Sequence, residues 1–396
     1  MTWADTVALR DLATKVGLIG GPFGSSLVGS DYTPSGVPVI RGTNLGHGRF
    51  LGGDFAYVSP TKANGELARN QARPGDLVFT QRGTLGQIAM VPEGGADAYV
   101  VSQSQMRLRV DPGRADARFV YYACTTNDFM RQIGDHAIAT GVPHINLGIL
   151  GTLRVPDVPL SEQRAIAGVL GALDDKIATN TREEAVLDRL IAAHYARALQ
   201  ESEARTEALL EAFDVDFGEP FGGEFFAPPG DGRPLIRIRD LKTFDSQVWT
   251  TEVRRRETVV RAGDVVVGMD AEFRATIWLG KPGLLNQRVC RVRSAVAGAA
   301  LVREALRAPL AEIEGYKSAT TVIHLNKEDL ARSSVAIPSA RALTAFEALA
   351  EPVLARRVAL ASERRSLAAT RDALLPALMF GALRVRDAER VVEGAV

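Results

Sequence analysis

Polar side chains that can hydrogen-bond to base edges and phosphates occur beside short β-prone runs in both halves of the chain. Amide, guanidinium, hydroxyl and carboxylate groups are the ones that read base edges and contact the phosphate backbone. The candidate nucleic-acid contacts are Arg41, Asn44, Gln81, Arg82, Thr84, Ser102, Gln103 and Gln105 in the first half, and Arg239, Lys242, Glu272, Arg274, Asn286 and Arg288 in the second. The alternative for each residue is a polar hairpin tip or strand edge without a ligand.

Two further motifs have a possible binding role and a structural alternative. The glycine-rich stretch Gly20–Ser26 could bring backbone N–H groups close to a phosphate, but a plain turn around a buried Phe23 is the favoured interpretation. His144 and His324 occur in similar local sequences, and residues that stay the same in both copies favour a scaffold role over a backbone or phosphate contact.

Motifs for catalysis by this chain are absent from the sequence. It lacks a phosphate loop, a dinucleotide-binding glycine pattern, a nucleophile elbow and a His-Glu-x-x-His helix. The five histidines are scattered without metal-ligand spacing, and the two cysteines, Cys124 and Cys290, cannot form a disulfide framework or an all-cysteine zinc site. We therefore predict a non-enzymatic protein without a metal or cofactor of its own.

Composition and charge place the chain among globular proteins. It has 396 residues, 46% of them hydrophobic, and 47 basic residues balance 47 acidic ones. This length predicts at least two domains, and the zero net charge excludes a strongly basic protein. Arginine greatly outnumbers lysine, which suits phosphate contacts but is equally explained by genomic base composition. The N-terminus lacks a signal-peptide pattern and no apolar run is long enough for a membrane span, so a cytoplasmic location is expected.

Two segments rich in Ala, Leu, Glu and Arg predict long helices, from about Ser161 to Ala212 and from about Ala340 to Met379. Apolar residues recur in heptads in both, and the first has a polar middle; Pro352 predicts a helix start or a kink in the second. The candidate coiled-coil or partner-binding residues are Ile166, Leu170, Leu173, Ile177, Asn180, Leu187, Phe346, Val353, Leu360, Leu367 and Leu374.

The sequence also repeats itself. Residues 139–146 align with 319–326 without a gap, and four landmarks recur in the same order: 20–24 with 218–222, 39–41 with 235–237, 73–76 with 261–264, and 155–156 with 337–338. A repeat this long predicts two domains. The predicted fold is α+β (mixed α/β), with globules at 1–156 and 213–338, long helices at 157–212 and 339–384 and a tail at 385–396. The helices are expected to pack antiparallel, giving a dumbbell with pseudo-two-fold symmetry.

The order of motifs resembles the specificity subunit of type I restriction-modification systems along nearly the whole chain. The motifs are Gly20–Ser25, Pro74–Gly86, Pro159–Ala167, Leu173–Ile177 with Asn180, Phe213–Phe217 and Leu374–Leu378 with Gly381. The stretch from Ser161 to Ile177, which leads from a globule into a long helix, is the most specific. Two differences stand out: Pro338–Phe346 departs from the Pro-Leu-Ser-Glu-Gln pattern, and the second globule is shorter. They put in question how equally the two halves hold partners.

The resemblance implies a function. Members of this family carry two target recognition domains that each read one half of a split, asymmetric double-stranded DNA site. Their two helices hold two methylation subunits and, through these, restriction subunits. The partners then use S-adenosylmethionine, ATP and Mg, and this chain supplies sequence choice in phage defence. Two alternatives remain open: a DNA-targeting adaptor of another defence system, and a coiled-coil scaffold protein without a DNA role.

Overall fold

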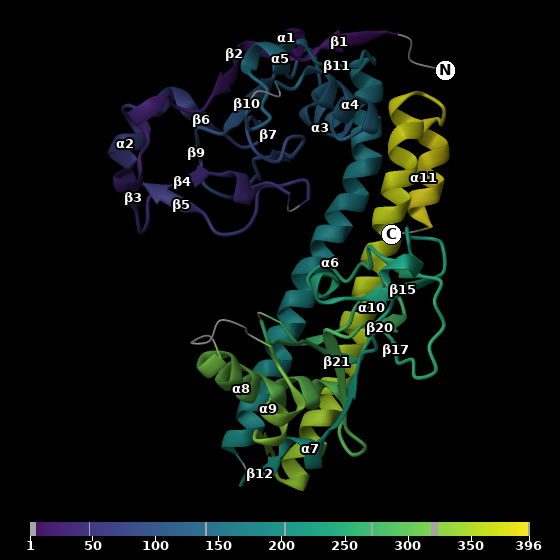
Figure 1. Ribbon diagram of the computed structural model, residues 1–396. Helices are drawn as coiled ribbons and strands as arrows, with labels where there is room; N and C mark the ends of the chain where they lie inside the picture. Colours follow the sequence, from purple (N-terminus) through teal and green to yellow (C-terminus); the bar gives the residue numbers. More distant parts are fainter. Residues whose placement is uncertain are drawn as a thin grey trace. The chain divides into compact units, whose positions relative to one another are not determined.

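The computed structural model describes residues 5–46, 48–138, 141–201, 203–270, 272–317 and 324–394. These form two compact units (Figure 1). Unit 1 comprises Met1–Lys176 and Leu367–Val396, and unit 2 comprises Ile177–Ser366. The boundaries between the units therefore fall within two long helices, α6 (Leu160–Gln200) and α10 (Ala340–Met379). No helix in the described residues is both long and apolar enough to cross a membrane.

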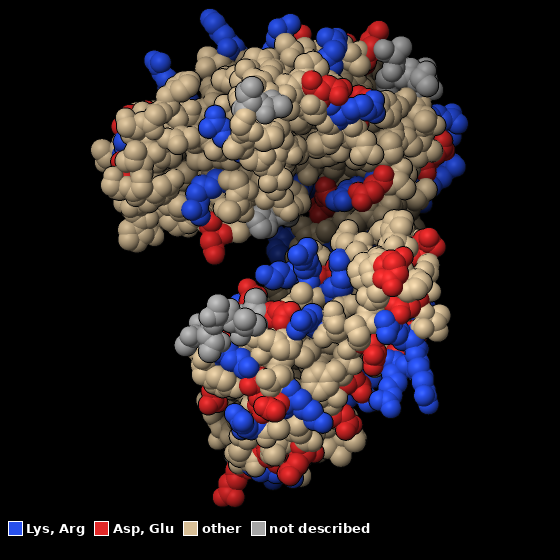
Figure 2. Space-filling model, viewed as in Figure 1, with Lys and Arg blue, Asp and Glu red and all other residues tan. Residues whose placement is uncertain are grey.

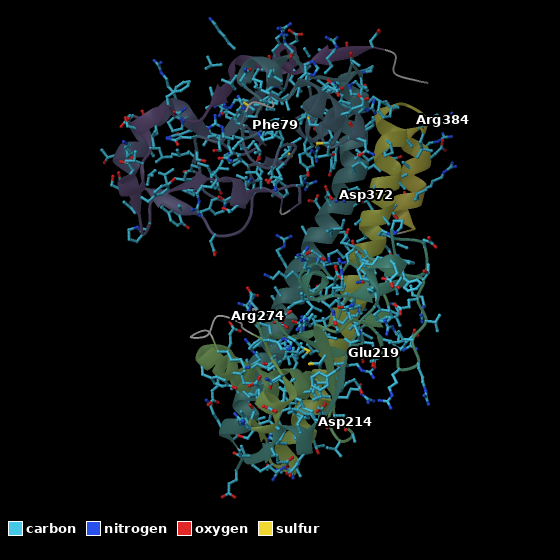
Figure 3. The ribbon with its side chains drawn as sticks, viewed as in Figure 1. Phe79, Asp214, Glu219, Arg274, Asp372 and Arg384 are labelled. Atoms are coloured by element: carbon cyan, nitrogen blue, oxygen red, sulfur yellow. The ribbon has the colours of Figure 1, made fainter. Side chains whose placement is uncertain are left out.

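Unit 1 contains two main sheets built from the short β-prone runs. The first has the order β2 (Ala13–Gly20), β10 (Gln105–Val110), β7 (Leu77–Thr80), β8 (Ile88–Met90), with every neighbouring pair antiparallel. The second has the order β3 (Tyr32–Thr33), β5 (Ala56–Val58), β4 (Val37–Ile40), β9 (Tyr99–Val101), β6 (Gln71–Ala72), and only its β4–β9 pair is parallel. All four residues of β7 are buried, including Phe79, which is labelled inside unit 1 in Figure 3.

Short helices complete unit 1, and their starts follow from the sequence. Asp116, Thr126 and Asn146 accept hydrogen bonds from backbone N–H groups at the starts of α3 (Ala117–Cys124), α4 (Asn127–His136) and α5 (Leu147–Thr152), which is the usual role of such side chains at a helix N-cap. A two-stranded sheet of β1 (Thr6–Ala8) and β11 (Arg154–Pro156) joins the ends of the globule. The remaining helices of this unit are α1 (Leu9–Leu12), α2 (Pro60–Asn64) and α11 (Val385–Glu393).

Unit 2 repeats the same strand order. Its four-stranded sheet is β13 (Asp214–Phe217), β21 (Val289–Arg293), β18 (Val265–Gly268), β19 (Ala275–Ile277). Its five-stranded sheet is β14 (Phe226–Ala227), β16 (Trp249–Thr250), β15 (Arg233–Ile236), β20 (Gly283–Leu285), β17 (Val259–Val260), and β15 and β20 form the parallel pair. A sheet of β12 (Arg205–Ala208) and β22 (Ser334–Ile337) joins the ends. Its other helices are α7 (Leu209–Ala212), α8 (Ala299–Lys317) and α9 (Lys327–Ala331).

The two copies also share their turn chemistry. The backbone N–H of Arg73 donates to the Asp76 carboxylate over 2.8 Å, and that of Arg261 donates to the Asp264 carboxylate over 2.7 Å. Equal strand order and equal turns confirm the predicted tandem repeat. Part of the most similar stretch, at residues 139–140 and 319–323, lies outside the described residues.

The long helices run antiparallel within unit 2. Asp188 of α6 lies 2.6 Å from Arg357 of α10, while Tyr195, two turns further along α6, packs against Phe346, three turns earlier in α10. Within unit 1, Asp174 pairs with Arg371 over 2.7 Å. The heptad positions are mostly buried, with Leu173, Leu360 and Leu367 at most 1% exposed. The predicted antiparallel helix pair is therefore confirmed within unit 2.

The predicted end of the first helix was wrong, and of the two alternatives for Pro352 the helix start is excluded. The first helix was expected to reach Ala212 but ends at Gln200, because residues 205–208 become β12 and pair with β22, a long-range partner that helix propensity cannot register. Pro352 neither starts nor ends the second helix, which runs from Ala340 to Met379 through that position.

Candidate nucleic-acid interface

A cavity of about 520 Å³ in unit 1 brings together several of the predicted contacts. The glycine-rich loop forms one wall, and the tip of the β7–β8 hairpin and the turn before β10 form the others. The lining residues are Gly20, Gly21, Pro22, Phe23, Gly24, Gln81, Arg82, Gln103, Ser104, Asn146, Leu147 and Gly148. Three predicted contacts, Gln81, Arg82 and Gln103, therefore share one concave site.

Close backbone packing holds the glycine-rich loop against this site. The N–H of Gly21 donates to the Gln105 carbonyl over 3.0 Å, and a Cβ at Gly21 would lie 1.9 Å from the Ser102 carbonyl oxygen. Only glycine fits so close an approach. The side-chain amide of Gln103 then donates to the carbonyls of Gly24 (2.7 Å) and Leu27 (3.1 Å). The amide donors of Gln103, which were predicted to contact bases, therefore bind the loop backbone and hold the loop in place.

The hairpin tip is also held by the backbone. Gln81 donates its N–H to Ser104 over 2.7 Å and accepts at its carbonyl from Ile145 over 3.0 Å. These bonds leave the side chains of Arg82 and Thr84 exposed at the tip, with Gln81 half-buried. The tip therefore presents a guanidinium, a hydroxyl and part of an amide to solvent, which are suitable groups for hydrogen bonds to a polar ligand.

Phe23 occupies a different place from the one expected. Its side chain is 92% exposed, so the interpretation of a turn around a buried Phe23 was wrong. In unit 2 the corresponding Phe221 is buried, with the Arg254 guanidinium 6.0 Å from the centre of its ring. The two loops differ in length: a Cβ on Gly218 would lie 2.0 Å from the Asn286 carbonyl oxygen, as one on Gly21 would lie 1.9 Å from that of Ser102, so one more residue precedes the phenylalanine in unit 2.

The remaining candidates of unit 1 divide into exposed and buried side chains. Arg41 is exposed and Ser102 is half-buried. Asn44 is fully buried: its amide donates to the carbonyls of Gly52 and Asp54, and its oxygen accepts from the N–H of Arg41. Gln105 is 1% exposed and accepts a hydrogen bond from the Ser102 hydroxyl. Asn44 and Gln105 hold the sheet ends together and do not reach the surface.

A cavity of about 570 Å³ borders the corresponding hairpin of unit 2, on a different side from the cavity of unit 1. It lies beside the β18–β19 hairpin and the turn after β15. Its lining residues are Ile238, Arg239, Leu241, Lys242, Phe244, Gly268, Asp270, Glu272, Arg274 and Thr276. Four predicted contacts, Arg239, Lys242, Glu272 and Arg274, therefore converge on it, and Figure 3 shows Arg274 at the surface of this unit.

Charged pairs surround this second cavity. Glu272 lies 3.5 Å from Lys242 and 3.8 Å from Arg274. The Asp270 carboxylate lies 2.7 Å from Nδ1 of the His324 ring and 3.6 Å from the Arg288 guanidinium. Arg288 is exposed, whereas Asn286 is 8% exposed and lies beneath the surface. On the face shown in Figure 2, basic and acidic side chains are interspersed over each unit.

The two hairpin tips that border the cavities occupy equivalent backbone positions. Gln81 and Met269 each donate an N–H to the turn before the next strand, at Ser104 and Arg288, and each accepts an N–H from the residue after a histidine. The neighbouring positions, Arg82 and Asp270, bridge to His144 and His324. Both histidines therefore sit in the same scaffold position, as the sequence favoured, although His324 also binds Asp270 through its ring.

Groups suited to other chemistry are inaccessible or dispersed. Burial raises the pKa of the Cys290 thiol to about 12 and that of Cys124 well above its ordinary value, so both thiols stay protonated. In the part of the chain that the structure describes, no three His, Cys, Asp or Glu side chains gather as metal ligands would. The predicted polar contacts converge on the two loop cavities.

Comparison with known proteins finds similarity to one kind of protein. Residues 27–189 match the type I restriction modification DNA specificity domain. The chain is 34% identical to the type I restriction enzyme EcoBI specificity subunit of Escherichia coli over 127 residues, 32% of this chain and 27% of that protein. It is 22% identical to the type I restriction enzyme MjaIX specificity subunit of Methanocaldococcus jannaschii over 94% of this chain and 92% of that one.

A solved structure has a similar fold. The crystal structure of the S subunit of a type I restriction-modification system from M. genitalium superposes with a TM-score of 0.57 at 16% identity, covering 95% of this chain and 96% of that one. The domain match and the similarity along nearly the whole chain make this protein similar to type I restriction-modification specificity subunits, and the solved structure shares its fold.

Proposed function

We propose that this chain chooses the DNA sequence for a type I restriction-modification complex, with each unit contacting one half of a split, asymmetric duplex site. The observation that carries the proposal is that equivalent hairpin tips, at Gln81–Thr84 and Asp270–Arg274, each border a cavity in two copies of one sheet frame. The frame is the same, but Gln81 and Arg82 in one copy are replaced by Met269 and Asp270 in the other. Two modules that bind different half-sites require this combination of shared scaffold and different contact groups.

The exposed side chains supply the chemistry of base and phosphate recognition. In unit 1 these are Arg41, Arg82 and Thr84, together with the exposed part of Gln81. In unit 2 they are Arg239, Lys242, Glu272, Arg274 and Arg288. Guanidinium groups bind guanine or phosphate, amides bind adenine and carboxylates accept from cytosine. Asn44, Gln105 and Asn286 are left out of the contact set because they are buried.

Catalysis belongs to partner subunits in this proposal. Two methylation subunits dock on the long helices, and restriction subunits join through them; these partners use S-adenosylmethionine, ATP and Mg. The heptad side chains are buried in the chain's own helix pair, so the outward faces of the helices remain for docking. On α6 this face includes Val186, 53% exposed, and Leu190, 37% exposed, which is apolar surface of the kind that partner helices cover.

The proposal is tested by mapping methylated adenines genome-wide in the host with and without this gene. A split motif with two short defined halves should lose its methylation in the deletion strain. Replacing residues 1–156 with the same region of a relative should change one half of the motif and leave the other. Identical maps, together with no binding of purified chain to random duplex DNA, would point instead to a scaffold protein.

A finer test uses single side chains at the two loop tips. Arg82→Ala should relax or change one half-site, and Arg274→Ala should affect only the other half. Arg131→Ala is a matched control because Arg131 is an exposed residue of α4 outside both cavities, paired with Asp128 at 3.3 Å. Each lost base contact should cost about 1–3 kcal/mol of discrimination. An equal effect of either variant on both half-sites would contradict the modular assignment.

A further inference from the structure

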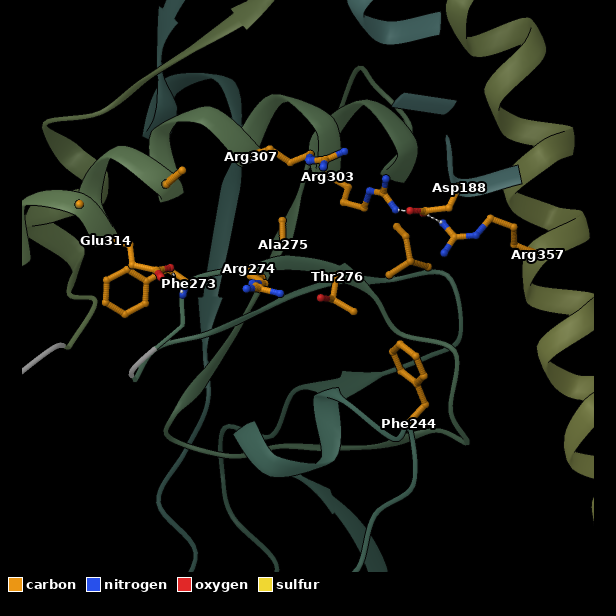
Figure 4. Close-up of a pocket in the computed structure, with 13 residues that line it drawn as sticks. Asp188, Phe244, Phe273, Arg274, Ala275, Thr276, Arg303, Arg307, Glu314 and Arg357 are labelled. Atoms are coloured by element: carbon orange, nitrogen blue, oxygen red, sulfur yellow. Dashed lines mark hydrogen bonds and ion pairs between the residues drawn. The ribbon is translucent and has the colours of Figure 1, made fainter. Parts of the chain in front are cut away.

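Unit 2 contains another cavity, of about 680 Å³, that the predicted contacts do not explain (Figure 4). It lies between α8, the strand β19 and the unit-2 parts of both long helices. The residues that line it are Asp188, Phe244, Phe273, Arg274, Ala275, Thr276, Ile277, Arg303, Arg307, Ala311, Glu314, Gly315 and Arg357. Its volume is in the range of small-molecule sites.

Positive charge exceeds negative charge along its walls. Arg274, Arg303, Arg307 and Arg357 line the cavity, against the carboxylates of Asp188 and Glu314. Glu304, just behind the wall, is a third carboxylate, and it pairs with Arg303 and with Arg307. Glu314 accepts a hydrogen bond from the backbone N–H of Phe273 over 3.0 Å. Glu272 pairs with both Arg274 and Lys242, so five cations face four carboxylates and one positive charge remains, which favours an anionic ligand.

The inner wall holds two buried guanidinium groups that share one carboxylate. Arg303 is 6% exposed and Arg357 is 8% exposed, and both pair with Asp188 (Figure 4). The Nε of Arg357 has no hydrogen-bond partner in the described part of the protein. A buried donor without a partner destabilises the folded chain, and an anion in the cavity would stabilise this incompletely neutralised group.

The outer wall carries two guanidinium groups with donors to spare. The Arg307 side chain is 58% exposed and its Nη1 donates to Glu304 over 3.0 Å, and Arg274, 75% exposed, lies no closer than 3.8 Å to its paired carboxylate, Glu272. Thr276 adds a hydroxyl to the same wall, and Phe244 adds an aromatic ring. Guanidinium groups bind phosphate oxygens with two parallel hydrogen bonds. Arg303 and Arg357, deeper in the cavity, are less available for this because both already pair with Asp188.

We propose that this cavity binds a phosphate group through Arg274 and Arg307. The phosphate belongs to a nucleotide, because the cavity shares Phe244, Arg274 and Thr276 with the adjoining recognition cavity of unit 2. It comes either from a DNA strand that runs from one cavity into the other or from a free nucleotide. The first source rests on the proposed function, and the second does not.

The test uses the purified full-length chain with Arg274→Gln and Arg307→Gln, separately and together. Arg332→Gln is the control, since it removes an exposed positive charge from the same unit outside the cavity. Binding of a duplex that contains the target site is measured from 50 to 200 mM salt, and binding of inorganic pyrophosphate is measured by calorimetry. Arg307→Lys tests whether charge alone is enough.

If DNA supplies the phosphate, each single variant should lower the slope of log K against log salt by about 0.9, and the double variant by about twice that. The loss should be similar for specific and random duplexes with Arg307→Gln. If a free nucleotide supplies it, wild type should bind pyrophosphate and the double variant should lose at least tenfold in affinity. The proposal is overturned if the double variant matches Arg332→Gln in both measurements. If wild type binds pyrophosphate but no duplex, the proposed function is contradicted and the phosphate site is supported.

Discussion

Gly21 passes so close to Ser102 that a Cβ on the glycine would lie 1.9 Å from the serine carbonyl oxygen. Unit 2 repeats this close approach, since a Cβ on Gly218 would lie 2.0 Å from the Asn286 carbonyl oxygen. This close approach holds the glycine-rich loop against the turn that carries Ser102 and Gln103. The Gln103 side chain then fixes the loop with two hydrogen bonds to its carbonyls. These contacts therefore fix the position of the loop as one wall of the recognition cavity.

Gly21→Ala should therefore displace the loop. We expect a loss of about 1–3 kcal/mol in the free energy of unfolding, as for other overpacked sites, and at least tenfold weaker binding to the first half-site. Gly29→Ala is the matched control, since a Cβ there meets no atom within 4 Å. Denaturant unfolding and binding to half-site variants measure the two effects. Equal behaviour of the two alanine variants would rule out a positioning role for Gly21.

Phe23 should matter for binding and not for folding. Its side chain is 92% exposed beside the cavity of unit 1, and apolar side chains at this kind of site can contact thymine methyl groups or base steps. Phe23→Ala should change the free energy of unfolding by less than about 0.5 kcal/mol while weakening DNA binding severalfold.

Phe79→Ala provides the contrast, because Phe79 is 1% exposed in the sheet core and should lose about 3–5 kcal/mol. Thermal unfolding and an equilibrium DNA-binding assay separate the two variants. Unchanged DNA affinity of Phe23→Ala would show that this exposed ring lies away from the duplex.

The pair of Asp174 and Arg371 should be a strong determinant of stability in unit 1. Asp174 is 8% exposed, binds Arg371 over 2.7 Å and accepts a hydrogen bond from the Tyr122 hydroxyl over 2.6 Å. Arg371→Met leaves a buried carboxylate without its cation, so we expect a loss of about 3–5 kcal/mol.

Arg384→Met removes an arginine whose side chain is 83% exposed (Figure 3) and should cost at most about 1 kcal/mol. Urea unfolding of the full chain compares the two variants. Similar midpoints and slopes for both would mean that Asp174 is better solvated than its burial indicates.

Glu184 should make stability depend on pH. Burial raises its pKa above the ordinary value of 4.5, against a smaller opposite effect from Arg364, Arg357 and Arg365. The folded chain then binds a proton more readily than the unfolded chain, so stability falls as pH rises from 4.5 through the raised pKa. Glu184→Gln should remove this dependence and be more stable than wild type above that interval.

Glu183→Gln is the control for the pH experiment. The Glu183 side chain is 38% exposed and pairs with Arg356 over 2.8 Å, so its removal should leave the pH dependence in place. Denaturant unfolding of wild type and both variants from pH 4.5 to 8 measures the effect. A pH dependence that persists unchanged in Glu184→Gln would assign it to another group.

The sequence by itself determined the repeat, the two long helices and the mixed α/β class. Heptads such as Phe346, Leu360 and Leu367 and the Arg73–Asp76 turn are local or periodic signals, and such signals survive without knowledge of distant contacts. The loop tips at Gln81–Thr84 and Glu272–Arg274 were also visible, because polar residues directly after buried strands must lie at sheet ends.

Tertiary structure alone decided which of these residues reach the surface. Asn44 and Gln105 are polar residues that the folded chain buries, and Phe23 is an aromatic residue that it exposes. The first long helix ends at Gln200 because the following segment pairs with β22, more than a hundred residues later. The arginine cavity joins Asp188, Arg303 and Arg357 from three separate helices. Burial and convergence depend on long-range packing, which spacing along a single chain does not encode.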